Sequence, residues 1–205
     1  MKRLLLTVTM AVFLLIACSP EGHRVSSETL ELTVMDRQVL DYRGNVLLTR
    51  SQLPSRVRVS PGSEFAAPDR FVRAQMSPNG EYLGVTTVGG AHAAAWIYRV
   101  GDDQPRPAAF QLGGSLSLDR WHPDSTYLAI RHKTPAGAQL LSVTEVARLS
   151  DYIEDANQLI KVPKHDELSA QHLRYNALGW EERGLRFNLA GQRWVYHPQE
   201  GVSAY

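Results

Sequence analysis

The histidines are the residues of this 205-residue chain best suited to bind a metal ion or to transfer a proton near neutral pH. None of the seven forms a close pair of the His-Glu-x-x-His kind, in which two rings lie on one helix face. His165 and His172 are the remaining candidates, because they stand close together in a polar stretch. That spacing alone does not define a metal site, so the sequence predicts neither a metal centre nor a bound cofactor.

Other catalytic motifs are missing from the sequence or have simpler interpretations. It contains no Gly-x-Ser-x-Gly nucleophile turn and no phosphate-binding loop. Gly101-Asp102-Asp103 could touch calcium, but a single acidic turn is typical of a hairpin tip. His122-Pro123-Asp124 has the letters of the co-chaperone J-domain motif, which requires a loop between two helices, whereas a strand is expected to follow here. We therefore expect no catalytic residues and no enzyme activity.

The tryptophans are the other side chains that could hold a ligand, since an indole combines a large apolar surface with one N–H donor. They stand at similar positions of an internal repeat, which favours core packing between repeats over a ligand-stacking surface or an exposed anchor for a partner. The four are Trp96, Trp121, Trp180 and Trp194. The sequence therefore identifies no individual binding residue.

The N-terminus has the pattern of a secretion signal. Lys2 and Arg3 precede an apolar run from Leu4 to Ala17, after which the chain becomes polar at once. A helix needs roughly 20 apolar residues to cross a bilayer, so this run is too short for a comfortable membrane span. We expect residues 1–17 to be removed on export.

The end of the signal carries a more specific pattern, Leu15-Ile16-Ala17-Cys18, which resembles the lipobox of bacterial lipoprotein precursors. The resemblance implies cleavage between Ala17 and Cys18 and a lipid on the Cys18 thiol, which would anchor the protein to a membrane. In Gram-negative lipoproteins an aspartate after the cysteine retains the protein at the inner membrane, so Ser19 implies the periplasmic face of the outer membrane. A Gram-positive host would remove that last step, and an ordinary signal peptide with a chance cysteine is the alternative.

The composition after the signal predicts a short tether followed by a single domain. Lys and Arg number 22 against 21 Asp and Glu, so no basic surface for nucleic acid is expected. Residues 18–28 are polar and rich in serine, which predicts a lipidated N-terminus and a flexible tether. Residues 29–205 are long enough for a single domain with its own core. Cys18 is the only cysteine, so no intramolecular disulfide can form and the fold must depend on burial.

The body of the chain predicts an all-β fold. Short apolar runs alternate with turn residues, beginning with strands at 30–39 and 46–50 around a turn at 41–45. An internal repeat follows: Met76 to Val85 aligns without a gap with Trp121 to Ile130, and Trp180 to Phe187 is a weaker third copy. Each copy places a bulky apolar residue before a turn and a strand after it.

This repeat resembles the WD40-like propeller repeat of the TolB type. The resemblance covers residues 71–148 and, more weakly, 177–205, where the Pro-Asp pair is missing. It implies a small or partial β-propeller-like array of antiparallel four-stranded units. The chain is long enough for four units at most, so it would be the smallest closed propeller, an open arc, or a half that pairs with a partner. A β-sandwich built from similar hairpins is the alternative.

One segment interrupts the β pattern and predicts an inserted helix. Residues 150–161 place apolar side chains on one helical stripe, Ser150 suits the N-cap, and Pro163 would end the helix. Inserted elements in repeat proteins often lie on a binding face. The helix could equally cover an open sheet edge.

Two functions of different classes agree with these features. The first is a non-catalytic envelope lipoprotein whose surface binds another envelope protein. The second is a receptor or an enzyme for a cell-wall or sugar-derived small molecule. A pocket with convergent carboxylates, or a nucleophile beside a base, would favour the second function.

Overall fold

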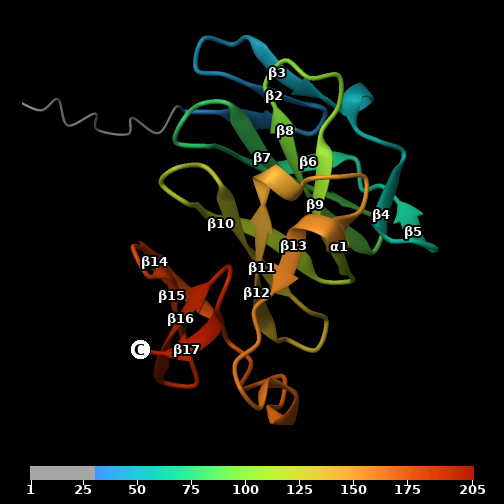
Figure 1. Cartoon of the computed structure of the whole chain (residues 1–205). Helices are drawn as coiled ribbons and strands as arrows, with labels where there is room; N and C mark the ends of the chain where they lie inside the picture. The colour runs from blue at the N-terminus through green and yellow to red at the C-terminus, as the bar shows by residue number, and fades with distance from the viewer. Residues whose placement is uncertain (1–30) are drawn as a thin grey trace, which may run out of the picture.

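The computed structural model describes residues 31–205, so the predicted signal peptide, Ala17, Cys18 and the predicted tether lie outside the described residues. The described chain is all-β, as predicted, and forms antiparallel sheets of two to four strands (Figure 1). Its helical segments are single turns: η1 (Arg50–Gln52), η2 (Val146–Arg148), α1 (Ile153–Ala156) and η3 (His165–Glu167). Within residues 31–205, no helix has the length and apolar character needed to cross a bilayer.

Three of the sheets have four strands each, and in each one every strand pairs with the next along the chain. The first consists of β6 (Arg70–Met76), β7 (Tyr82–Gly89), β8 (His92–Arg99) and β9 (Arg106–Leu112). The second consists of β10 (Ser115–Trp121), β11 (Tyr127–Lys133), β12 (Gln139–Glu145) and β13 (Asn157–Leu159). The third consists of β14 (Asn176–Glu181), β15 (Gly184–Leu189), β16 (Gln192–His197) and β17 (Gly201–Ala204).

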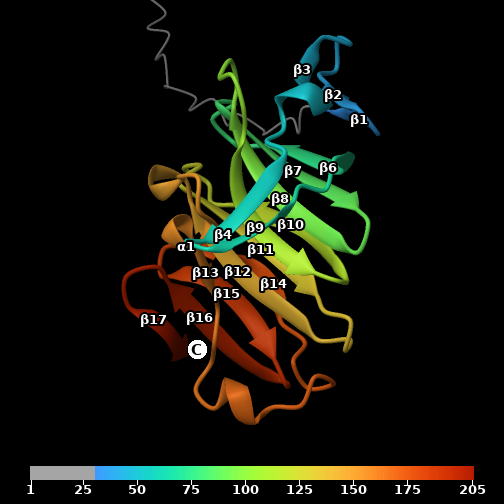
Figure 2. The same cartoon turned by 90° about the vertical axis from the view of Figure 1, so that its right-hand side faces the viewer.

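Two smaller sheets precede them along the chain. The first has three strands, β1 (Thr33–Met35), β2 (Gln38–Leu40) and β3 (Val46–Thr49). The second is the hairpin of β4 (Arg56–Ser60) and β5 (Ser63–Ala66). Figure 2 shows the β1–β3 sheet at one end of the molecule and the β14–β17 sheet at the other, with the β6–β9 and β10–β13 sheets between them.

The two stronger repeat copies form the same turn between the first and second strands of their sheets. The Ser77 N–H donates to the Tyr82 carbonyl oxygen (2.8 Å), and the His122 N–H donates to the Tyr127 carbonyl oxygen (2.7 Å). Gly80 and Ser125 occupy the same left-handed position, with φ of +74° and +69°. That conformation suits glycine and costs other residues energy, so the second copy keeps the turn despite a less favourable residue.

Trp121 and Trp180 connect the second and third repeat copies to the copy that precedes each of them. The Trp121 indole N–H donates to the carbonyl oxygen of Gln75 (3.3 Å), the residue that precedes the first repeat copy. The Trp180 indole N–H donates to the carbonyl oxygen of Arg120 (3.3 Å), the residue that precedes the second copy. Equivalent side chains therefore make equivalent bonds across successive sheets, which confirms that the repeat is structural and that these tryptophans belong to the packing between sheets.

Three hydrophobic clusters lie between successive sheets. One joins the β1–β3 sheet and the β4–β5 hairpin to the β6–β9 sheet around Val39, Val57 and Trp96. The next joins the β6–β9 sheet to the β10–β13 sheet around Ile97 and Trp121. The last joins the β10–β13 sheet to the β14–β17 sheet, and it includes Leu141, Tyr175 and Phe187. The two inner four-stranded sheets are therefore buried on both faces, whereas the sheets at the two ends pack on one face.

The predicted inserted helix is wrong over most of its length. Residues 150–161 form only the single turn α1 and then β13, which pairs with β12. Ser150 does not cap α1: its hydroxyl donates to the Asp155 carboxylate and to the Tyr152 carbonyl oxygen. The apolar spacing of the segment has another cause, since Ile153 enters one cluster and Ile160 another. This segment completes the second sheet with its fourth strand.

Two strand predictions are also corrected. The single strand expected at 30–39 is interrupted by a turn at Asp36-Arg37, so that β1 and β2 form a hairpin. Prolines at 54, 61 and 68 make residues 51–69 loop-like in composition, with Val57 and Val59 as a possible short strand, but the region contains the β4–β5 hairpin. Phe65 is the only large apolar residue of β5, so this strand has no clear alternation.

Replacement of Trp121 tests the packing between the β6–β9 and β10–β13 sheets. The side chain is 6% exposed, so we expect Trp121→Ala to lower the free energy of unfolding by about 3–5 kcal/mol in urea denaturation. Leu112→Ala is the matched control, because that side chain is 57% exposed on β9 and its loss should change the free energy by less than about 0.5 kcal/mol. Unchanged melting of Trp121→Ala would contradict the core assignment.

Candidate functional site

The candidate residues from the sequence lie in separate parts of the chain and do not form one site. The predicted lipid site, Cys18, and the cleavage position after Ala17 lie outside the described residues. His165 and His172 are each engaged by a hydroxyl, of Tyr175 (2.7 Å) and of Ser169 (2.8 Å) respectively. Among residues 31–205, no group of three or more His, Cys, Asp or Glu side chains could hold a metal ion.

The histidine-proline-aspartate motif belongs to the repeat turn between β10 and β11. Asp124 accepts hydrogen bonds from the Thr126 backbone and hydroxyl, and it contacts the His122 ring. Although partial burial opposes the shift, the hydrogen bonds from Thr126 and His122 lower the pKa of Asp124 below its usual value. The motif therefore stabilises a tight turn, and the strand predicted to follow it is β11 (Tyr127–Lys133).

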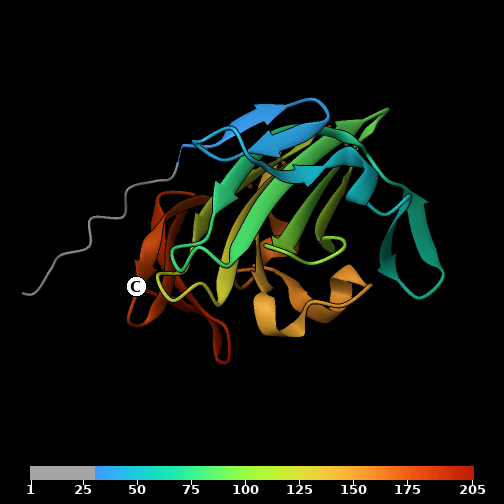
Figure 3. The same ribbon diagram turned by 90° about the horizontal axis from the view of Figure 1, so that it is seen from above.

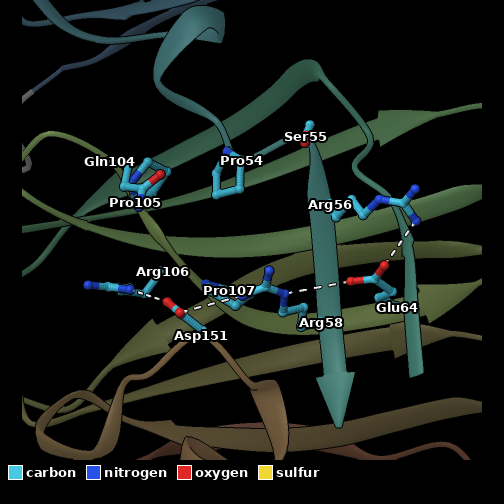
Figure 4. Close-up of a pocket in the computed structure, with 10 residues that line it drawn as sticks. All are labelled: Pro54, Ser55, Arg56, Arg58, Glu64, Gln104, Pro105, Arg106, Pro107 and Asp151. Atoms are coloured by element: carbon cyan, nitrogen blue, oxygen red, sulfur yellow. Dashed lines mark hydrogen bonds and ion pairs between the residues drawn. The ribbon is translucent and has the colours of Figure 1, made fainter. Parts of the chain in front are cut away.

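A cleft of about 520 Å³ lies beside the β4–β5 hairpin (Figure 4). Three parts of the chain bound it. They are the β4–β5 hairpin with the two residues before it, the turn that leads into β9 together with the start of β9, and Asp151, which lies just before α1. Its lining is Pro54, Ser55, Arg56, Arg58, Glu64, Gln104, Pro105, Arg106, Pro107 and Asp151. We define these ten residues as the arginine cleft.

Strand alternation directs the charged side chains into the arginine cleft. Along β4, Arg56 and Arg58 are exposed while Val57 between them is fully buried in the core. Opposite Val57 in the hairpin stands Phe65, whose ring stacks on Phe110 at 4.6 Å between centroids. The hairpin is thus held by its apolar face, which leaves the other face to present charge.

Alternating ion pairs run across the cleft. Glu64 lies 3.1 Å from the Arg56 guanidinium and 3.6 Å from that of Arg58. Arg58 reaches Asp151 at 3.6 Å, and Arg106 also pairs with Asp151. All five side chains are about half exposed, so these pairs contribute little to stability. Three guanidiniums against two carboxylates leave the cleft with one excess positive charge.

The cleft is rich in fixed hydrogen-bond donors. A guanidinium stays protonated in proteins and presents five N–H donors, so it cannot act as a general base. Both carboxylates are already engaged by arginines. The remaining N–H groups of Arg56 and Arg106 can donate to a carboxylate, a phosphate or backbone carbonyls of an incoming group, and the three prolines make the rim stiff.

Sequence reasoning missed the arginine cleft. Its charged residues come from separate segments of the chain, and they meet only because the hairpin folds back onto β9 and α1. The local signal was the Arg-Val-Arg-Val alternation of residues 56–59, which predicts one charged face of a strand. It does not indicate which other charges that face will meet.

A second concavity, of about 190 Å³, lies between the β10–β13 and β14–β17 sheets. Tyr127, Glu145 and Tyr196 contribute to its lining. Burial raises the pKa of Tyr196 to about 12, with smaller contributions from Tyr127 and Glu145. The Tyr196 hydroxyl therefore stays protonated and donates to the side-chain oxygen of Gln158.

His132 and Ser142 form the arrangement that most resembles a base beside a nucleophile. The ring Nε2 of His132 lies 2.8 Å from the Ser142 hydroxyl, and Asn157 donates to the same hydroxyl at 3.0 Å. His132 is 7% exposed and Ser142 is fully buried, so a substrate has no access to either. Burial lowers the pKa of His132 to about 4, and the neutral ring serves a hydrogen-bonded network between β strands.

No protein-family model matches this chain, and no curated protein matches it. Function must therefore be argued from the residues and their geometry.

The buried His132 predicts a loss of stability on mild acidification. Between pH 6.5 and about 4 the unfolded chain binds a proton at this residue and the folded chain does not, so stability falls as the pH falls through that window. The full effect is about 3 kcal/mol. We expect urea denaturation of His132→Gln to show a correspondingly smaller decrease over the same window.

His165 is the internal comparison for that experiment. Burial, with a contribution from Lys161, also lowers the pKa of His165, so the His132→Gln protein should retain part of the pH dependence. If the two proteins lost stability equally between pH 6.5 and pH 4, the assignment of the effect to His132 would be wrong.

Proposed function

We propose that this protein is a lipid-anchored, non-catalytic module of the bacterial envelope that binds another envelope protein. In this proposal residues 1–17 are removed, Cys18 carries the lipid, and the domain lies on the periplasmic side of the outer membrane. The lipobox-like sequence supports the anchor, and Ser19 supports the choice of membrane. No nucleic acid partner, metal or cofactor forms part of the proposal.

The proposed architecture is a partial β-propeller-like array formed by residues 29–205. The four-stranded sheets, their sequential pairing and the equivalent tryptophan bonds between sheets support it. A propeller closes when its last unit packs against its first. The β14–β17 sheet packs on the β10–β13 sheet, while the β1–β3 sheet packs on the β6–β9 sheet. An open arc is therefore the arrangement that we favour.

The single observation that carries the binding function is the arginine cleft. Its arginines keep unused N–H donors, its ion pairs contribute little to stability, and its rim is stiffened by prolines. Interfaces are enriched in arginine relative to the rest of the surface. A partner segment that carries carboxylates or exposed backbone carbonyls fits this chemistry.

A receptor or an enzyme for a cell-wall or sugar-derived small molecule is the second candidate. The smaller concavity supports it, because Tyr127 and Tyr196 offer ring faces and hydroxyls next to the carboxylate of Glu145. Most of the lining is polar, however, since it also includes Arg148, Glu154 and Asp155, whereas small-ligand sites are mostly apolar. Its volume of about 190 Å³ lies below the range that such sites usually occupy, and we therefore rank it second.

Substitution of the predicted lipid attachment residue tests the anchor. We expect Cys18→Ser to abolish both lipid attachment and membrane retention, measured by fractionation and by the mass of the mature N-terminal peptide. Ser19→Asp is the matched control, which should keep the lipid but move the protein to the inner membrane. A Cys18→Ser protein still held in membranes through a lipid would refute the anchor.

Site-specific photocrosslinking in cells tests the binding site. A photoreactive residue at Gln104, in the cleft, should give an adduct with one envelope protein, and Arg58→Glu with Arg106→Glu should remove that adduct. Arg193→Glu is the control, because Arg193 is an exposed arginine on β16, outside the cleft. Absence of an adduct, or an adduct that survives the double charge reversal, would exclude the cleft as the contact site.

A further inference from the structure

The outward face of the β1–β3 sheet has an unusual composition. The strand register places Met35 opposite Gln38, and Gln38 opposite Thr49. The same register places Thr33 opposite Leu40, and Leu40 opposite Val46. Opposed residues share a face, and Val34, Val39 and Leu48 fill the other face, which packs on the core. The outward face therefore carries six uncharged side chains: Thr33, Met35, Gln38, Leu40, Val46 and Thr49.

Large apolar groups on this face are open to solvent. Met35 is 50% exposed and Val46 is 52% exposed, and Tyr42, in the turn between β2 and β3, is 57% exposed. Figure 3 shows the β1–β3 sheet along the outer side of the stack, with no other described sheet beyond it. These exposed apolar side chains gather on one small sheet and form a candidate contact surface.

The opposite end of the stack has a different chemistry. The β14–β17 sheet presents Arg186, which forms an ion pair with Glu181 (2.9 Å), and Arg193 is exposed on the neighbouring strand. Both sheets end the stack, so the need to cover the core does not explain the difference. The six outward-facing residues of the N-terminal sheet carry no charge, and its charged residues, such as Arg37, Asp41 and Arg43, lie in its turns.

The size of the outward face argues against a protein partner or a second copy as its occupant. A strand of four residues is roughly 13 Å long, and three strands side by side are roughly 14 Å wide. The resulting area of about 200 Å² is far below the ~800 Å² that each partner contributes to a stable protein interface. An occupant that binds weakly but is always present fits this area better.

The length of chain that precedes the β1–β3 sheet identifies such an occupant. Thr33 follows Cys18 by only 15 positions in the sequence, so a lipid on Cys18 is attached close to the β1–β3 sheet along the chain. A compact unit of the size of residues 31–205 is roughly 40 Å across. A lipid on Cys18 therefore keeps the β1–β3 sheet closer to the bilayer than any other sheet.

We propose that the outward face of the β1–β3 sheet, together with Tyr42, rests on the interfacial region of the membrane that holds the lipid of Cys18. This inference depends on the proposed anchor. Tyrosine favours the membrane–water interface because its ring is apolar and its hydroxyl is polar. The Arg43 guanidinium lies 5.0 Å from the Tyr42 ring centroid, where it can reach lipid phosphates. The tether supplies a high effective concentration, so a small contact suffices.

The orientation has a consequence for the arginine cleft. The cleft is formed by the β4–β5 hairpin, the start of β9 and Asp151, and Figure 3 shows that hairpin at the end of the molecule away from β1. A domain that rests on its β1–β3 sheet leaves the cleft open to the periplasm. The membrane contact and the protein contact would then use separate surfaces.

The depth of two probes on the anchored full chain tests this inference. Val46→Cys and, as control, Leu112→Cys are each purified with their lipid and labelled with an environment-sensitive thiol dye. The control residue is 57% exposed on β9. In vesicles of phosphatidylethanolamine and phosphatidylglycerol, the emission of the probe at position 46 should shift to shorter wavelength and be quenched by lipids labelled near the headgroup. The probe at position 112 should do neither.

The labelling itself separates this inference from the proposed anchor. A lipidated Cys18 cannot take the dye, so one dye per chain shows that the anchor is present. With one dye per chain, identical water-like spectra at positions 46 and 112 would overturn the membrane contact and leave the anchor intact. Two dyes per chain would show a free Cys18 thiol, which would overturn the anchor and the contact that depends on it.

Discussion

The β6–β9 sheet buries both of its faces, and the rest of the described structure depends on that constraint. In β8, Ala93, Ala95 and Ile97 point to one side, while Ala94, Trp96 and Tyr98 point to the other. Period-two alternation therefore divides one strand between two hydrophobic clusters. Such a sheet cannot be stable alone, because either face would expose apolar surface. It requires the β1–β3 sheet and the β4–β5 hairpin on one side, and the β10–β13 sheet on the other.

Burial on both faces also explains why several polar groups inside the stack are hydrogen-bonded to one another. The Trp96 indole donates to the Thr87 hydroxyl (2.9 Å), and the Thr144 hydroxyl donates to the Ala108 carbonyl oxygen (2.9 Å). An unpaired polar group in such a place costs about 1–3 kcal/mol. These bonds fix the alignment of neighbouring strands and sheets, which hydrophobic contact alone does not specify. Burial also lowers the pKa of His132 to about 4, so its ring is neutral near pH 7 and contacts the Ser142 hydroxyl as a neutral group.

The sequence predicted those features that repeat or alternate locally. The repeat at Met76, Trp121 and Trp180 identified the turns and the strands that follow them, because turn residues and bulky anchors are visible without knowledge of distant contacts. The helix prediction for residues 150–161 was wrong for the opposite reason. Their apolar spacing matches a helix, but Ile153 and Ile160 serve two different clusters, and only the tertiary structure reveals two destinations. The arginine cleft was missed on the same grounds, since Arg58 and Arg106 meet Asp151 only after folding.

The outer faces of the β1–β3 and β14–β17 sheets, at the two ends of the stack, carry different kinds of side chain. A charged outer face, such as that of Arg186 and Glu181, is well solvated and resists association with other sheets. An uncharged face with exposed Met35 and Val46 keeps apolar surface in water, which favours aggregation of a protein that diffuses freely. The anchor proposed at Cys18 would change the balance, because a bilayer held close to that face would cover the apolar side chains before another protein does. The asymmetry of the stack is therefore what the proposed attachment at its N-terminal end would require.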